Sequence, residues 1–201
     1  MFVPTERPTT ATPPETPSDD ALMALVQEGD RVAFARLVER HHARVWAVAW
    51  RYAGSAALAQ DLVQDAFLKL WETAPRYRAD GRFGGYLLRL LVNRALNLKR
   101  SAGREITGEI PESSTERRFE SPSAMDPEER LESARRRNLV QEAMRSLPDS
   151  QRMALALRYQ EEMSYEEIAR VMETSVKAVE RLMARGREGM RARLAHLSTS
   201  T

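Results

Sequence analysis

Apolar residues recur every three or four positions along most of the chain, which is the spacing of one buried face on an α-helix. The period is clearest between Phe34 and Tyr52, where Leu37, Val45 and Val48 fall on a single face. No stretch of about four to eight residues alternates apolar and polar positions as a half-buried strand would. The pattern therefore predicts an all-α protein.

Capping and breaking residues divide this pattern into separate helices. We expect side-chain caps at Ser18, Asp30 and Ser55, and glycine stops at Gly29 and Gly54. A loop over 75–81 then leads into a fourth helix that ends near residue 100.

The helical period stops after Arg100 and resumes near Leu131. Residues 102–130 are rich in Ser, Pro, Gly and Glu, a composition typical of a linker. Residues 1–17 hold five prolines and few apolar residues, so we expect a disordered tail there. The sequence thus predicts two small helical domains, 18–101 and 131–197, joined by a flexible acidic linker, with a short tail over 198–201.

Charge becomes informative only when it is divided by segment. The 201 residues carry a net charge of +2. Residues 18–100 hold 13 basic and nine acidic side chains, and residues 131–201 hold 13 basic and ten acidic. The linker region, 101–130, holds four basic and eight acidic residues. Two basic modules joined by an acidic tether favour a nucleic-acid partner for the modules.

Several function classes are disfavoured by what the sequence lacks. There is no cysteine, only three histidines, and no nucleotide-binding, serine-hydrolase or zinc-protease motif. We therefore expect no enzyme activity, no metal, no cofactor and no small-molecule substrate. Apolar runs are far shorter than the roughly 20 residues that span a bilayer, and no secretory signal is evident. We expect a cytoplasmic protein that does not insert into a membrane.

The segment from Ser164 to Leu182 is predicted to form a helix-turn-helix. Ser164 and Glu167 make a capping box for a short helix, and Thr174 or Ser175 can cap the next one. The second helix would expose a largely basic stripe that fits a DNA major groove. An ordinary helical hairpin with a solvated charged face fits this pattern as well. The residues of the stripe are Lys177, Arg181, Ala184, Arg185 and Glu188.

Two more surfaces could carry binding. The fourth predicted helix and its preceding loop interleave aromatic and basic residues, and no acid occurs between Gly81 and Gly103. This suits single-stranded DNA, in which bases stack on rings, although Phe83 is better explained as core. On the third helix, Asp61, Asp65, Leu68 and Glu72 share a stripe. Apolar residues on more than one face suggest a second helical partner there, while a charged stripe alone is usually a solvated face.

The chain resembles the bacterial extracytoplasmic-function (ECF) sigma factors, small two-domain specificity subunits of RNA polymerase. The resemblance covers about residues 18–197 and rests on several motifs in the expected order. They are Gly29-Asp30-x-x-Ala33-Phe34, Asp61-Leu62-Val63-Gln64-Asp65, Tyr86-Leu87-x-Arg89-x-x-x-Asn93, Leu147-Pro148-x-x-x-Arg152, Ser164-Tyr165-x-Glu167-Ile168-Ala169 and Arg185-Gly186-Arg187.

The resemblance implies a function for each of these surfaces. The third helix would dock on the β′ coiled coil of core RNA polymerase through Asp61, Gln64, Asp65, Leu68 and Glu72. The fourth helix and its loop would melt and read the −10 promoter element through Arg78, Arg82, Tyr86, Arg89, Asn93, Asn97 and Arg100. The helix-turn-helix would read the −35 element as duplex, next to the β flap, through Ser175, Lys177, Ala178, Arg181, Arg185 and Arg187.

The family also implies an anti-sigma factor as a further partner. The sequence therefore predicts a sigma factor that directs core RNA polymerase to promoter DNA. Two alternatives stay open on the residues alone: a stand-alone helix-turn-helix regulator of duplex DNA, and a helical adaptor that binds only proteins.

Overall fold

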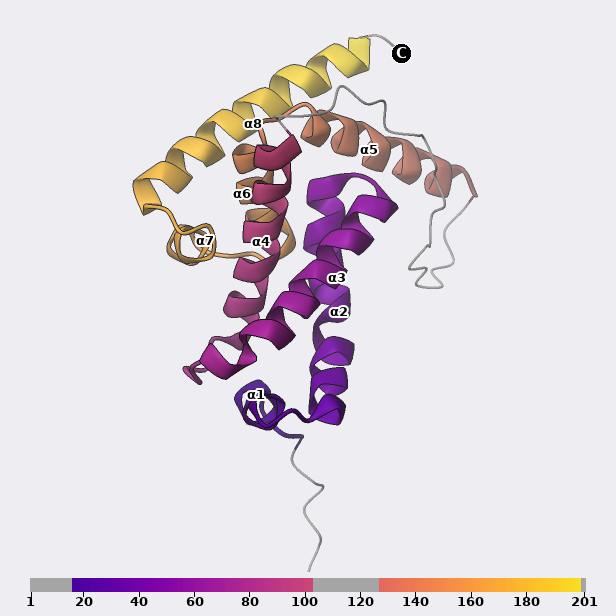
Figure 1. Cartoon of the computed structure of the whole chain (residues 1–201). Helices are drawn as coiled ribbons and strands as arrows, with labels where there is room; N and C mark the ends of the chain where they lie inside the picture. The colour runs from indigo at the N-terminus through magenta and orange to yellow at the C-terminus, as the bar shows by residue number, and fades with distance from the viewer. Residues whose placement is uncertain (1–15, 103–126, 200–201) are drawn as a thin grey trace, which may run out of the picture.

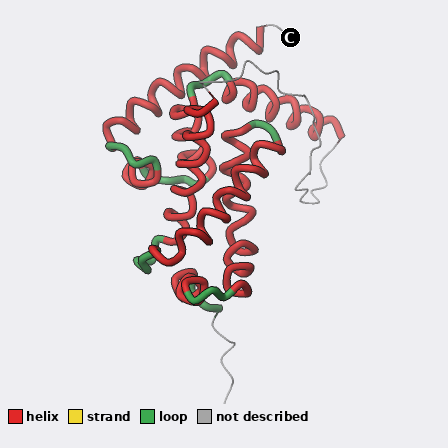
Figure 2. The backbone as a smooth tube through the Cα atoms, viewed as in Figure 1, coloured by secondary structure: helices red, strands yellow, loops and turns green. Residues whose placement is uncertain are grey.

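The computed structural model describes residues 16–102 and 127–199, and within them the secondary structure is entirely helical (Figure 2). Residues 1–15 of the predicted disordered tail and most of the predicted linker lie outside these residues. The elements are α1 (Asp19–Gln27), α2 (Arg31–Ala53), α3 (Ala56–Thr73), the 3-10 turn η1 (Ala74–Arg76), α4 (Phe83–Ala102), α5 (Pro127–Arg145), α6 (Asp149–Gln160), α7 (Tyr165–Val171) and α8 (Val176–Thr199).

The predicted caps define the first three helices. Ser18, Asp30 and Ser55 each accept hydrogen bonds from backbone N–H groups in the first turn of their helix, which would otherwise lack partners. Gly54 ends α2 with φ of 69°, a left-handed conformation that glycine adopts without steric cost. The capping predictions are confirmed at these positions.

The helix α5 begins earlier than the sequence predicts. It starts at Pro127 rather than near Leu131, so residues 127–130 are helical and not linker. Proline is favoured at the first position of a helix, because the missing N–H would have no intrahelical partner there. The exposed Glu129 also places a negative charge in the first turn, near the positive end of the helix dipole.

Helices α1–α4, here called the N-terminal module, pack around one apolar core. The long helix α2 lies against α1 and α3, and α3 lies against α4 (Figure 1). Fully buried side chains from all four helices meet between them. They include Leu22, Leu37, Val48, Leu62, Leu70, Leu87 and Leu91.

Helices α5–α8, the C-terminal module, are organised around α8. The helix α8 packs against α5, α6 and α7 (Figure 1). Val179 and Met183 on its inner face are buried against the apolar residues of α6 and α7, as the three-and-four spacing predicts. The two modules together confirm an all-α fold with a helix-turn-helix in the second module.

The two modules are in direct contact, which the sequence does not reveal. Helix α2 lies against α5 and α6, and α4 lies against α7. The buried Arg152 of α6 donates a hydrogen bond to the backbone oxygen of Tyr52 at 3.2 Å, and its guanidinium stacks on the Tyr52 ring at 5.0 Å. Its other bonds, to the Leu147 oxygen at 3.3 Å and the Asp149 carboxylate at 2.5 Å, stay within the C-terminal module.

A second contact between the modules forms at Gly54. Arg145 of α5 donates to the Gly54 backbone oxygen, and Gln141 donates to the Arg51 oxygen at 3.2 Å. These carbonyls belong to the C-terminal end of α2, where intrahelical donors are lacking. The C-terminal module therefore supplies hydrogen-bond donors to the end of α2.

Candidate functional site

The stripe predicted on α3 is present on its solvent face. Asp61, Gln64, Leu68 and Glu72 are exposed, and Asp65 is partly buried. Leu68 is 53% exposed, an unusual value for a leucine in a well-packed helix. Glu72 forms an ion pair with Lys69 at 2.9 Å. The structure thus brings all five predicted docking residues onto one helix, with an apolar side chain among the polar ones.

The remaining apolar residues of α3 serve the fold and not a partner. Val63 and Phe67 lie next to the deeply buried Leu62 and Ala66 around the helix, and all four are buried within the N-terminal module. Helix α3 packs against both α2 and α4, so two of its faces are covered internally. The expectation that its extra apolar face meets another protein is therefore wrong, and Leu68 is the apolar side chain that remains available.

An ion pair joins the α3 stripe to α4. The Arg94 guanidinium lies 2.5 Å from the Asp65 carboxylate. Both side chains are partly solvent-accessible, so the pair contributes roughly 0.2–1 kcal/mol at most. The sequence does not indicate this pair, because the two residues are 29 positions apart and only the packing of α3 against α4 brings them together.

The predicted single-strand surface occupies α4 and the loop before it. Arg78 and Arg82 are exposed on the loop side, Asn97 is exposed, and Asn93 is partly buried on α4. Arg100 lies on α4, but its side chain is outside the described part of the chain. The described members are basic or polar and lie along the loop and α4.

Tyr86 belongs to an aromatic group on this surface. Its hydroxyl lies 2.7 Å from the Thr73 hydroxyl, and its ring packs on Tyr77 at 5.1 Å. The Arg89 guanidinium lies over the Tyr86 ring at 5.3 Å, a cation–π contact. Phe83 is 2% exposed and belongs to the core, as expected.

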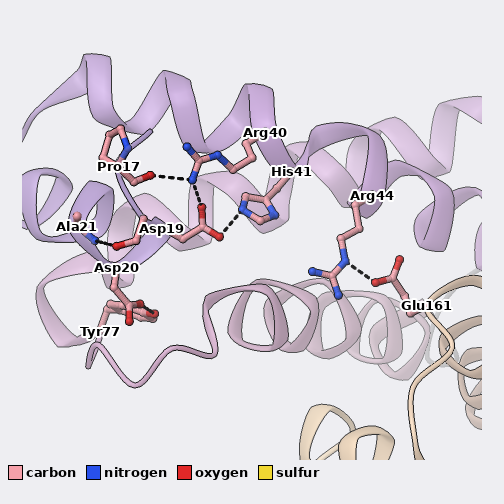
Figure 3. Close-up of polar contacts among 10 residues, drawn as sticks. Pro17, Asp19, Asp20, Ala21, Arg40, His41, Arg44, Tyr77 and Glu161 are labelled. Atoms are coloured by element: carbon pink, nitrogen blue, oxygen red, sulfur yellow. Dashed lines mark hydrogen bonds and ion pairs between the residues drawn. The ribbon is translucent and has the colours of Figure 1, made fainter. Parts of the chain in front are cut away.

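Acidic residues of the C-terminal module pair with arginine side chains of α4 and of the neighbouring helix α2. Glu173, in the turn after α7, lies 3.6 Å from Arg89. Glu161, after α6, pairs with Arg44 of α2 (Figure 3). The sequence gives no signal for either pair, since more than 80 residues separate the partners. In this arrangement the C-terminal module lies beside the predicted −10 surface.

The helix-turn-helix forms as the capping pattern predicts. Ser164 and Glu167 make the reciprocal capping box of α7, and the hydrogen bonds to Ser164 lower the pKa of the Glu167 carboxyl. Glu173 has φ of 51° in the turn. The Ser175 hydroxyl caps α8 by accepting from the Ala178 N–H at 3.2 Å. Of the two capping candidates, Ser175 is therefore the one used.

The predicted −35 residues divide into two groups on α8. Lys177, Arg181 and Arg185 are exposed, and their spacing of four residues places them on one face. Ala178 is partly buried beside them. Arg187 lies on another face, where it donates to the Tyr165 hydroxyl of α7 at 2.9 Å.

Two further properties of the described residues concern ligands and membranes. Within residues 16–102 and 127–199, no three His, Asp or Glu side chains are placed to hold a metal ion. None of the helices in that part of the chain is both long enough and apolar enough to cross a membrane.

Comparison with known proteins places each module in a described family. The family description "Sigma-70 region 2" matches residues 37–105, and "Sigma-70, region 4" matches residues 137–190. The ECF RNA polymerase sigma-E factor of Escherichia coli strain K12 is 34% identical over 177 residues, covering 86% of this chain and 92% of that protein.

Solved structures share the fold. CnrH in complex with the cytosolic domain of CnrY has a TM-score of 0.62 at 28% identity, covering 89% of this chain and 97% of CnrH. The sigma factor RpoE of Bartonella quintana, in complex with the anti-sigma factor NepR, has a TM-score of 0.62 at 20% identity, covering 81% and 96% of the two chains. With a match of 34% identity along most of the chain and both sigma-70 regions present in order, the chain belongs to the ECF sigma factors of bacterial RNA polymerase.

Proposed function

We propose that this sigma factor docks on core RNA polymerase through the exposed stripe of α3 and directs it to promoters with −10 and −35 elements. The observation that carries the proposal is the placement of Asp61, Gln64, Leu68 and Glu72 on one solvent-facing stripe beside the basic surface of α4. A stripe of acids around an exposed leucine fits a helical partner with basic residues around an apolar position. As a subunit of RNA polymerase it would act in the cytoplasm.

The −10 element would be read as single-stranded DNA by α4 and its loop. The Tyr86 ring can stack on an unpaired base, Arg82 and Arg89 can neutralise phosphates, and Asn93 can hydrogen-bond a base edge. For Arg89 to reach DNA, its ion pair with Glu173 must open. The pair is exposed and long, so opening it costs little.

The −35 element would be read as duplex DNA by α8. Lys177, Arg181 and Arg185 project from one face near the N-terminal end of this helix, the usual geometry of a recognition helix in a major groove. Ser175 at the helix start can donate to a phosphate. Arg187 would contact phosphate from the flank, where Tyr165 holds its guanidinium.

An anti-sigma factor is the further partner that we propose. The family resemblance implies one, and the Bartonella sigma factor of the same fold was solved with such a partner. A candidate recovered by two-hybrid screening should compete with core polymerase for this protein in a binding assay. A candidate that leaves core binding unaffected would not be the regulator proposed here.

The docking role is tested by reversing one charge. Asp61→Arg should weaken binding to core polymerase while leaving the Asp65–Arg94 pair intact. Glu39→Arg, which reverses an exposed acid on α2, is the matched control and should bind core normally. Circular dichroism checks that both variants fold. Equal core affinity for Asp61→Arg and the wild-type protein would contradict docking through α3.

Reconstituted transcription separates the proposal from the two alternatives. Purified protein with core polymerase should yield run-off transcripts from fragments of genomic DNA. A stand-alone regulator would shift duplex DNA without polymerase, and an adaptor would bind neither DNA nor core.

Two substitutions on α8 distinguish base contacts from phosphate contacts. If Arg181 reads a base, Arg181→Ala should weaken promoter binding by roughly 1–3 kcal/mol and relax one promoter position. Arg187→Ala should weaken binding to all sequences and reduce the salt slope by about one.

A further inference from the structure

The loop that joins α3 to α4 is fastened by the N-terminal helix α1. This recognition loop, residues 74–82, carries three exposed guanidinium groups at Arg76, Arg78 and Arg82. Its backbone path decides where those groups project. Apart from the buried residues Ala74 and Tyr77, the loop has little apolar anchorage of its own. Hydrogen bonds from elsewhere must therefore hold its conformation.

Gln27, the last residue of α1, holds the first half of the loop. Its side-chain amide donates to the backbone oxygen of Ala74 at 3.0 Å and to that of Tyr77 at 2.9 Å. A single NH₂ group thus bridges two carbonyls on either side of the turn. This contact fixes where the chain leaves α3.

Asp20, in the first turn of α1, holds the second half. One carboxylate oxygen accepts the Tyr77 hydroxyl at 2.5 Å, and the other accepts the Gly81 N–H at 2.8 Å. Gly81 has φ of 72°, so the backbone reverses at the point where Asp20 binds it. Burial and the bond to Asp20 raise the pKa of the Tyr77 hydroxyl, which keeps it protonated as the donor.

Asp19 has a different role from its neighbour. It binds Arg40 at 2.6 Å and lies 2.9 Å from His41, both on α2 (Figure 3). Asp19 therefore fastens α1 to the helical core, whereas Asp20 fastens the loop to α1. Figure 3 shows the two carboxylates pointing away from each other, toward α2 and toward Tyr77. The two consecutive acids thus bind different elements, and the buried Leu22, Met23 and Val26 anchor α1 to the core independently of Asp19.

We propose that Asp20 and Gln27 are positioning residues for promoter recognition, which hold the recognition loop in the shape that selects single-stranded promoter bases. Neither residue needs to touch DNA. The inference rests on the proposed reading of the −10 element by α4 and this loop. It gives α1 a part in promoter selectivity. Helix α1 lies before the Sigma-70 region 2 match, which begins at residue 37.

The test uses the holoenzyme and a fork-junction DNA library with a randomised single-stranded non-template segment. Bound molecules are sequenced, and selectivity is the enrichment of the preferred sequence over the library mean. Asp20→Ala removes both loop contacts and should lower this enrichment by about tenfold, the factor for one charge-assisted hydrogen bond. Tyr77→Phe keeps the ring and should lower it less. The Asp20→Ala/Tyr77→Phe double variant should be no worse than Asp20→Ala.

Two variants distinguish positioning from simple destabilisation. Asp20→Asn can accept from the Gly81 N–H through its carbonyl and donate to the Tyr77 oxygen through its amide, so it should restore selectivity. Like Asp20→Ala, Asp19→Ala removes one negative charge from the first turn of α1, and it also removes the ion pair with Arg40. It should lower the free energy of unfolding but leave the enrichment profile unchanged.

The possible outcomes separate this inference from the proposed function. If the wild-type holoenzyme enriches a clear sequence and Asp20→Ala enriches it equally, the positioning role is overturned while the proposed −10 recognition stands. An equal loss of selectivity with Asp19→Ala would also overturn it, since general destabilisation would then suffice. If the wild-type holoenzyme itself enriches no sequence in the single-stranded segment, the proposed −10 recognition fails.

Discussion

The buried Arg152 offers a quantitative test of how the two modules are held together. Its side chain is 6% exposed, and its guanidinium serves backbone oxygens of Tyr52 and Leu147 together with the Asp149 carboxylate. Arg152→Met keeps most of the side-chain volume and removes every donor. Both carbonyls lie at the ends of helical segments, so no intrahelical N–H replaces the lost bonds.

The expected cost follows from those partners. Each buried carbonyl left without a donor costs roughly 1–3 kcal/mol. Asp149 is 28% exposed and regains water, so its contribution is small. Burial of the methionine and relief of the desolvated cation offset part of the loss. We expect Arg152→Met to lower the free energy of unfolding by about 3 kcal/mol, which corresponds to a fall in Tm of roughly 6–12 °C.

Urea denaturation followed by circular dichroism measures this change. Arg158→Met is the matched control, because Arg158 lies on the same helix and bonds only to the Glu162 and Met163 oxygens within the C-terminal module. It should cost less than Arg152→Met. A loss below about 1 kcal/mol for Arg152→Met would refute the reasoning, since the carbonyl of Tyr52 would then not depend on this side chain.

Three further measurements address the helix ends and a buried hydroxyl. Gly54→Ala should lower Tm more than Gly29→Ala: both have positive φ, but only at Gly54 would the new Cβ meet Arg145, at 2.5 Å from its Nε. Equal losses would show that backbone strain alone matters. Ser164→Ala should cost about 1 kcal/mol by removing the cap of α7, and no change in urea midpoint would count against the cap. Burial and Asp149 raise the pKa of Tyr52 to about 12, above its ordinary 10.0. The stability that the neutral Tyr52 hydroxyl contributes should therefore be fully present below pH 10, and the free energy of unfolding should fall by about 2–3 kcal/mol as pH rises to 12. Tyr52→Phe should reduce this decline in alkaline denaturation curves.

Local features of the fold could be predicted because their causes are local. The caps at Ser18, Asp30 and Ser55 act on backbone groups two or three residues away, and the capping box of α7 spans only four residues. The buried faces of α2 and α8 follow from helical spacing in the same way. For these elements the sequence contains both interacting partners within one turn.

Contacts between distant segments could not be predicted. Arg94 and Asp65 meet because α3 and α4 pack together, and Arg44 meets Glu161 across 117 residues. Nothing in the spacing of charged residues distinguishes such pairs from solvated ones. That α2 and α4 cover both apolar faces of α3 could not be predicted either, since periodicity shows that a face is buried but not which element covers it.

Helix α2 packs against helices of both modules, and this has a consequence for hydrogen exchange. The residues Val45, Val48 and Ala49 in its middle are at most 1% exposed. Their amides can exchange with solvent water only when the surrounding helices open on several sides, so they should be among the slowest in the chain. The short helix α7 lies at the edge and can open locally. Amide exchange along α2 therefore records, residue by residue, whether the two modules are in contact.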